Sequence, residues 1–166
     1  MTVYIVGTDH EMQHDAPSHR TAPDKVQRAR REFQTYLCTL VDRLKIQVIA
    51  EEFSQEALNG RHAESTVRPV ADKLGIEHRF CDPNVAEREE LGLPHPFLDH
   101  RKEREMPQLN QIREQNWLDR LSDVLHRDII FICGAKHVHT FFELIRSKGI
   151  SATVEREHFA KEIYGS

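Results

Sequence analysis

The chain has 166 residues, of which 39% are hydrophobic and 30% charged, and its formal net charge is −4 at pH 7. This composition is typical of a globular domain and gives no general attraction to nucleic acid. No apolar run approaches the ~18 residues of a membrane span, and the N-terminus does not resemble a signal peptide. We therefore expect one cytoplasmic domain over residues 1–166, with no nucleic-acid or membrane partner indicated.

Five short apolar runs alternate with segments of helical periodicity, and this alternation predicts a parallel sheet. The predicted strands are residues 3–6, 46–50, 77–81, 129–133 and 150–154. Apolar residues repeat every three or four positions between them, which predicts helices in residues 26–44, 63–74, 109–125 and 138–145. The pattern predicts an α/β, three-layer Rossmann-like fold, with a five-stranded mainly parallel sheet and helices on both faces.

Two segments do not fit this alternation, residues 7–22 and residues 82–106. Connections of this length are uncommon in compact domains and often act as lids or binding loops. Residues 82–106 are charged, include His95 and His100, and contain a candidate helical turn, VAEREEL. We interpret them either as a surface excursion or as a lid over an active site.

Residues 10–14 read H-E-M-Q-H, a formal match to the H-E-x-x-H signature of zinc peptidases. That signature requires a helix, on which residues four apart share one face and bind one zinc ion. Here the stretch follows a strand, and Pro17 and Pro23 come soon after it. We therefore interpret it as the end of G-T-D-H followed by a loop histidine.

The motif G-x-x-H occurs twice, each time just after a predicted strand. Gly7 and His10 follow the first strand, and Gly134 and His137 follow the fourth. With a strand order of 3-2-1-4-5 these two strands are neighbours, and Glu52 would lie on the other side of the first strand. Ligand sites of open parallel sheets lie at the carboxyl ends of the strands. Two histidines and a carboxylate there could hold a divalent metal ion with an open position for water.

The two glycines have an expected role in this arrangement. A strand-to-helix turn needs a residue that tolerates positive φ and lets a ligand approach the backbone. We expect Gly7 and Gly134 to serve this purpose, as cofactor-binding positions. The N-terminus of the helix after Gly134 would then direct its N–H groups at the site and favour a negative charge.

A family resemblance rests on the two G-x-x-H motifs, a glutamate after the second strand, and an arginine in the helix before the second motif. The stretch REQNWLDRL followed by DIIFICGAKHV contains Arg113 and Glu114 at the start of that helical pattern. Together these features resemble the TraB/TIKI/ChaN/EreA-like superfamily. The chain is much shorter than typical TraB or TIKI domains, and the resemblance covers its two ends more than its middle.

The resemblance implies a role for each matching residue. His10 and His137 would bind a metal ion or position water. Glu52, or Glu51 if the alignment slips by one residue, would complete the ligand set or act as general base. Arg113 would neutralise charge on the substrate or intermediate.

The resulting hypothesis is a small cytoplasmic metal-dependent hydrolase that acts on an unknown small molecule or peptide with a divalent metal ion as cofactor. The alternative is a non-catalytic binding module that holds an anionic small molecule, nucleotide or haem in the same cleft, and a third reading is an interaction protein. Neither G-x-G-x-x-G nor a Walker loop is present. The sequence leaves open the metal's identity and whether the chain forms a homo-oligomer.

Several other residues receive a structural interpretation. We expect Arg79 and Arg88 on the surface, although both could line an anionic pocket. The three cysteines lack a C-x-x-C pair, which argues against disulfides or a zinc ribbon and favours burial. They are Cys38, Cys81 and Cys133. Three further histidines are placed in loops, His14, His19 and His62.

Overall fold

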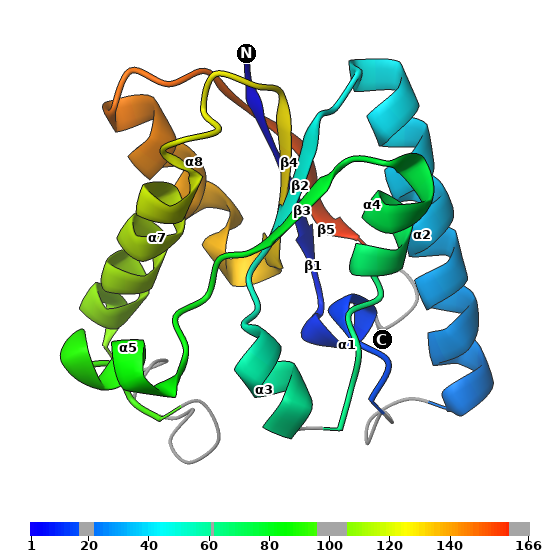
Figure 1. The fold of residues 1–166 in the computed structure, drawn as a ribbon, viewed down its shortest axis with the longest axis horizontal. Helices are drawn as coiled ribbons and strands as arrows, with labels where there is room; N and C mark the ends of the chain where they lie inside the picture. Colours follow the sequence, from blue (N-terminus) through cyan, green and yellow to red (C-terminus); the bar gives the residue numbers. More distant parts are fainter. Residues whose placement is uncertain (17–21, 61, 96–105, 160–166) are drawn as a thin grey trace.

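Five parallel strands form the middle layer of this computed structural model, which describes residues 1–16, 22–60, 62–95 and 106–159. The strands are β1 (Val3–Thr8), β2 (Val48–Glu51), β3 (Glu77–Phe80), β4 (Ile129–Gly134) and β5 (Ala152–Phe159). The helices are α1 (His10–Gln13), α2 (Pro23–Leu44), α3 (Gln55–Gly60), α4 (Arg68–Leu74), α5 (Val85–Glu90), α7 (Pro107–Leu121), the 3-10 turn η1 (Ala135–His137) and α8 (Val138–Ser147). Figure 1 shows α2 and α4 on one side of the sheet and α7 and α8 on the other. The predicted three-layer α/β architecture is confirmed.

The strand order is β3-β2-β4-β1-β5. β1 and β4 are neighbours in parallel register, but the order 3-2-1-4-5 is wrong, because β4 lies between β1 and β2. The reason is visible in the burial of the strands: all six residues of β4 are buried, whereas β3 and β5 contain only half-buried and exposed residues. The most apolar strand thus takes the centre, and the polar strands form the edges.

The element boundaries follow local signals. Proline opens α2 and α7, where a missing N–H group costs nothing, and Gly75 ends α4 in the left-handed conformation. Strand β1 continues to Thr8, beyond the predicted end, and β5 runs to Phe159 with register shifts against β1.

Part of the segment 82–106 lies within the described residues. The predicted turn in VAEREEL is helix α5, and Asn84 and Glu87 form a capping box at its start. Residues 96–105, the rest of the candidate lid, lie outside the described residues, as do residues 17–21 of the other long segment.

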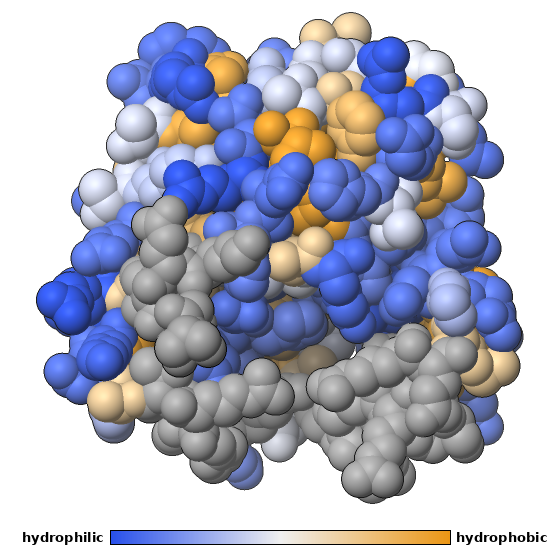
Figure 2. Space-filling model, turned by 180° about the vertical axis from the view of Figure 1, so that it is seen from behind, coloured by the Kyte–Doolittle hydropathy of each residue, from blue (hydrophilic) through white to orange (hydrophobic). Residues whose placement is uncertain are grey.

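Alternating strand residues fill two cores, one on each face of the sheet. Ile49, Ile130 and Ile132 face α2 and α4, whereas Ala50 and Phe131 face α7 and α8. Figure 2 shows hydrophilic residues over most of the face seen from behind, with hydrophobic residues in small groups. In the part of the chain that the structure describes, no helix has the length and apolar character needed to cross a membrane.

Gly7 illustrates how closely these layers pack. A Cβ atom at this position would lie 2.0 Å from the carbonyl oxygen of Glu157 and 2.5 Å from Cγ2 of Val138. Gly7 does not have a positive φ, so the expectation of a left-handed turn residue is wrong here. Glycine is required because β5 and the start of α8 approach the backbone of β1 on this side.

We expect Gly7→Ala to lower the free energy of unfolding by about 3 kcal/mol, because the backbone oxygen that it meets cannot move aside as a side chain can. Gly75→Ala is the matched control. A Cβ at Gly75 meets nothing within 4 Å, so its cost of about 1–2 kcal/mol comes from positive φ alone. Urea denaturation of the two variants measures the difference, and equal losses would contradict the steric explanation.

Candidate functional site

The carboxyl ends of β1, β4 and β2 bring four of the predicted residues together. His10 opens α1 after β1, and His137 ends the η1 turn after β4. Glu52 follows β2, and its N–H group donates to the carbonyl of Ile132 in β4 at 2.8 Å. Arg113 reaches the same point from the middle of α7.

Glu52 is the centre of this cluster, which also contains His10, Arg113 and His137. Its side chain is fully buried. Oε2 accepts a hydrogen bond from the N–H of Gly134 at 2.7 Å, and Oε1 accepts one from Arg113 at 2.8 Å. Burial alone would raise the pKa of Glu52, but His137 and Arg113 outweigh it and hold the pKa well below its usual value. Glu52 is therefore a buried anion.

His137 is buried between two carboxylates. Nδ1 lies 2.7 Å from Oε1 of Glu114, which also accepts a hydrogen bond from the hydroxyl of Thr140. Because an ionised carboxylate can only accept, Nδ1 carries the hydrogen of this bond. Burial lowers the pKa of His137, but Glu52 and Glu114 outweigh it and raise the pKa above its ordinary value.

The second ring nitrogen of His137 faces the cluster. Nε2 is buried and makes no hydrogen bond to any described residue, although it lies 3.3 Å from Oε1 of Glu52. In a neutral ring whose hydrogen is on Nδ1, this nitrogen would direct a lone pair at a carboxylate oxygen. The contact therefore requires a positive charge, either a proton on Nε2 or a cation bound between the two atoms.

His10 is the solvent-accessible member of the cluster, with a side chain 45% exposed. Its Nε2 lies 3.9 Å from Oε1 of Glu52, and its ring meets Phe53 edge-on. Partial desolvation lowers the pKa of His10, and Glu52 opposes this only in part. The imidazole is thus biased toward its neutral form, which is the form that binds metal ions.

Gly134 makes room for this histidine. A Cβ atom at position 134 would lie 2.9 Å from Nε2 of His10 and 3.3 Å from Oε2 of Glu52. The φ of Gly134 is −58°, so the expectation of positive φ is wrong at this position too. Glycine is needed because two polar side chains approach its backbone.

Arg113 is held by a carboxylate that the sequence analysis did not identify. Its Nε and Nη2 donate to Oδ1 of Asp82 at 3.0 and 2.7 Å, and Nε1 of Trp117 donates to the same oxygen at 3.0 Å. Arg88 donates to Oδ2 of Asp82 at 3.1 Å. Arg88 is buried, which corrects its expected surface position. The position of Asp82, directly after the third strand, was a signal that could have indicated it.

Glu51 does not join the cluster, because successive residues at the end of β2 point to opposite faces of the sheet. Its Oε1 accepts hydrogen bonds from the hydroxyl of Ser65 at 2.6 Å and from Nε2 of His78 at 2.8 Å. Burial raises the pKa of Glu51, and these two partners lower it only in part. Of the two glutamates left open by the sequence, Glu52 is the one at the site.

The H-E-M-Q-H stretch lacks the helix of a zinc peptidase. α1 ends at Gln13, and His14 is extended, with φ −142° and ψ 161°. Nδ1 of His14 accepts a hydrogen bond from the N–H of Ala16 at 3.2 Å. His62 is exposed, and His19 lies outside the described residues.

The remaining residues of the sequence analysis occupy structural positions. Arg79 forms ion pairs with Glu77 and Asp123. Cys81 and Cys133 are fully buried, and burial raises the pKa of both thiols, that of Cys81 to about 12. Cys38 is only partly buried. Both buried cysteines remain protonated at neutral pH and are poor nucleophiles.

Comparisons with known proteins identify no relative of this chain. The chain matches no protein-family model, and no curated protein or solved structure is significantly similar to it.

We expect Glu52→Gln to lower the free energy of unfolding at pH 7 by about 3 kcal/mol, because Arg113 and His137 would lose a buried counter-charge. The adjacent Glu51→Gln is the matched control. It should cost less than Glu52→Gln, since the amide oxygen can still accept from Ser65 and from Nε2 of His78. Urea denaturation in the presence of a chelator compares the two, and equal costs would argue against a charged Glu52.

Proposed function

We propose that the protein is a small cytoplasmic metal-dependent hydrolase, with its site at the carboxyl ends of β1, β2 and β4. The observation that carries the proposal is the contact between Nε2 of His137 and Oε1 of Glu52, two buried atoms 3.3 Å apart. A divalent cation between them would be bound by both atoms and would give Nε2 the partner that it lacks among the described residues. Nε2 of His10, which lies 3.9 Å from the same oxygen, is a candidate for the third metal ligand.

The distances support this assignment of ligands. Donor atoms at ~2.1 Å from a tetrahedral ion lie about 3.4 Å from one another. The two histidine nitrogens lie 3.3 and 3.9 Å from Oε1 of Glu52. Among the described residues no three His, Cys, Asp or Glu side chains form a ready-made metal site. In the proposal, the exposed ring of His10 rotates to complete the set.

The surroundings of His137 also favour a metal ligand. Metal-binding histidines usually donate their second N–H to a carboxylate or carbonyl, which fixes the ring and its tautomer. Glu114 occupies this place, at 2.7 Å from Nδ1. The edge of the ring lies against Trp117, with centroids 5.0 Å apart. His137 is therefore held rigidly with Nε2 toward the site.

A divalent ion held here would act as a Lewis acid and provide a nucleophile at neutral pH. Within the cluster, Glu52 is a ligand candidate, because its lowered pKa keeps it a buried anion. Arg113 neutralises Glu52 and Asp82 and fixes the direction of the Glu52 carboxylate. His10 lies at the solvent side, where a substrate can approach.

The alternative of a non-catalytic binding module for an anionic small molecule, nucleotide or haem has less support. The carboxylates of Glu52 and Glu114 lie beside the histidines, that of Asp82 lies beside Arg113, and all three repel an anion. The buried guanidinium of Arg113 is occupied by two of them.

We expect the protein, purified without a histidine tag, to contain about one divalent metal ion per chain. The double variant His10→Ala/His137→Ala should contain none, because it lacks both nitrogen ligands. His139→Ala is the matched control, since this histidine is exposed and pairs with Glu157 on the surface. Metal analysis by mass spectrometry gives the content, and circular dichroism shows whether each variant is folded.

Two results would overturn the proposal. The first is an absence of metal in the wild-type protein after incubation with zinc, manganese and iron. The second is retention of the metal by a folded double variant. A metal-loaded wild type would justify a screen of ester, amide and phosphoester substrates.

A further inference from the structure

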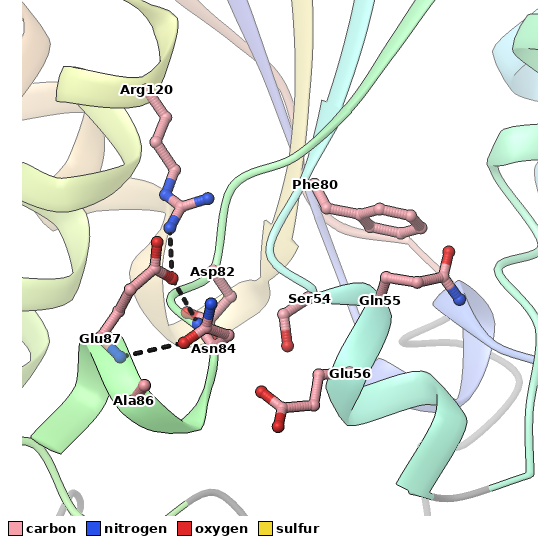
Figure 3. Close-up of a pocket in the computed structure, with 9 residues that line it drawn as sticks. All are labelled: Ser54, Gln55, Glu56, Phe80, Asp82, Asn84, Ala86, Glu87 and Arg120. Carbon is pink, nitrogen blue, oxygen red and sulfur yellow. Dashed lines mark hydrogen bonds and ion pairs between the residues drawn. The ribbon is translucent and has the colours of Figure 1, made fainter.

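A pocket of about 480 Å³ opens between α3 and α5 at the carboxyl ends of β2 and β3. Figure 3 shows Ser54 and Glu56 on the α3 side and Asp82, Asn84 and Glu87 on the α5 side. Its volume is within the range of small-molecule sites. The pocket lies at the edge of the sheet where open α/β folds bind their ligands.

Asp82 connects this pocket with the proposed metal site. Its side chain lines the pocket, and its Oδ1 accepts hydrogen bonds from Arg113, which in turn donates to Glu52. A molecule in the pocket is therefore separated from Glu52 by two side chains only. The pocket therefore adjoins the proposed metal site.

The charges of the lining decide what the pocket can hold. Asp82 is neutralised by Arg113 and Arg88, and Glu87 by Arg120 at 2.5 Å. Glu56 accepts a hydrogen bond at Oε2 from the N–H of Val85 at 2.8 Å. Among the described residues no basic side chain pairs with Glu56, so one carboxylate charge in the lining is left without a counter-charge.

The hydrogen-bonding groups agree with this charge. Oε1 of Glu56 accepts from no described residue, and Glu56 is exposed to solvent. The hydroxyl of Ser54 is used as an acceptor by the N–H of Ala57, and Oδ1 of Asn84 by the N–H of Glu87. Among the carboxylates of the lining, that of Glu56 is thus the one without a basic partner in the described residues, and it suits a donor with a positive charge.

We infer that the pocket between α3 and α5 binds an ammonium group of the substrate, with Glu56 as its counter-charge. That this ammonium group belongs to a substrate rests on the proposed function, whereas its binding in the pocket does not. An anionic group would meet the unpaired carboxylate, and a purely apolar group would leave the polar lining without partners.

Three probes test this in metal-free protein kept in a chelator. They are the Nα-acetyl amides of lysine, norleucine and glutamate, which present a cationic, an uncharged and an anionic side chain. Nitrogen-15 NMR measures their dissociation constants and locates them through the amide signals. The lysine probe should shift the signal of Val85, whose N–H group contacts Glu56, and should bind about fivefold more tightly than the norleucine probe.

Glu56→Gln should remove the preference for the lysine probe, because the amide keeps the shape and loses the charge. Glu143→Gln is the control, since Glu143 is an exposed glutamate of α8, in the lining of a groove remote from this pocket. It should keep the preference. Thermal unfolding monitors whether both variants fold.

Equal binding of the lysine and norleucine probes, no detectable binding of the lysine probe, or tighter binding of the glutamate probe would overturn the inference. So would shifts confined to residues outside 54–56 and 82–87. Because no metal is present, these results are independent of the metal analysis. A protein that binds metal but shows no lysine preference would retain the proposed function and lose this inference alone.

Discussion

The buried carboxylate of Glu52 is the interaction on which the site depends. It joins three elements that are remote in the sequence, since it follows β2, accepts from the backbone of Gly134 at the end of β4, and pairs with Arg113 of α7. A buried charge is tolerated only when its partners are in place. The requirement for those partners fixes the end of β4, the rotation of α7 and the direction of the carboxylate at the same time.

The sequence predicted the members of this cluster better than the path that brings them together. G-x-x-H after two strands identified His10 and His137, because side chains at the carboxyl ends of neighbouring parallel strands must meet. The strand order could not be derived from these motifs, since it depends on how fully each strand is buried on both faces. The wrong order still placed both histidines correctly, because β1 and β4 are neighbours in either arrangement.

Other parts of the site had weaker sequence signals. Asp82 follows a short strand, but the segment is charged and an aspartate there is an ordinary turn residue, so its position was a weaker signal than its contacts with Arg113 and Trp117. The sequence could not show whether Glu51 or Glu52 lies at the site. An error of one residue in the predicted end of a strand reverses the face on which its side chains lie. The glycines show a similar limit. Steric approach, which a sequence does not display, explains Gly7 and Gly134 where backbone conformation does not.

The charges around Glu52 lead to a further conclusion about what the site holds. Three buried carboxylates, Glu52, Asp82 and Glu114, are matched by two buried guanidiniums, Arg113 and Arg88. Among the described residues these carboxylates therefore outnumber the guanidiniums by one, and a low-dielectric environment makes such an imbalance costly. A proton on His137 restores the balance, and so does a cation bound between His137 and Glu52. The proton and the cation compete for the same nitrogen, Nε2. The raised pKa of His137 and the proposed metal site therefore have one physical origin, the negative charge of Glu52.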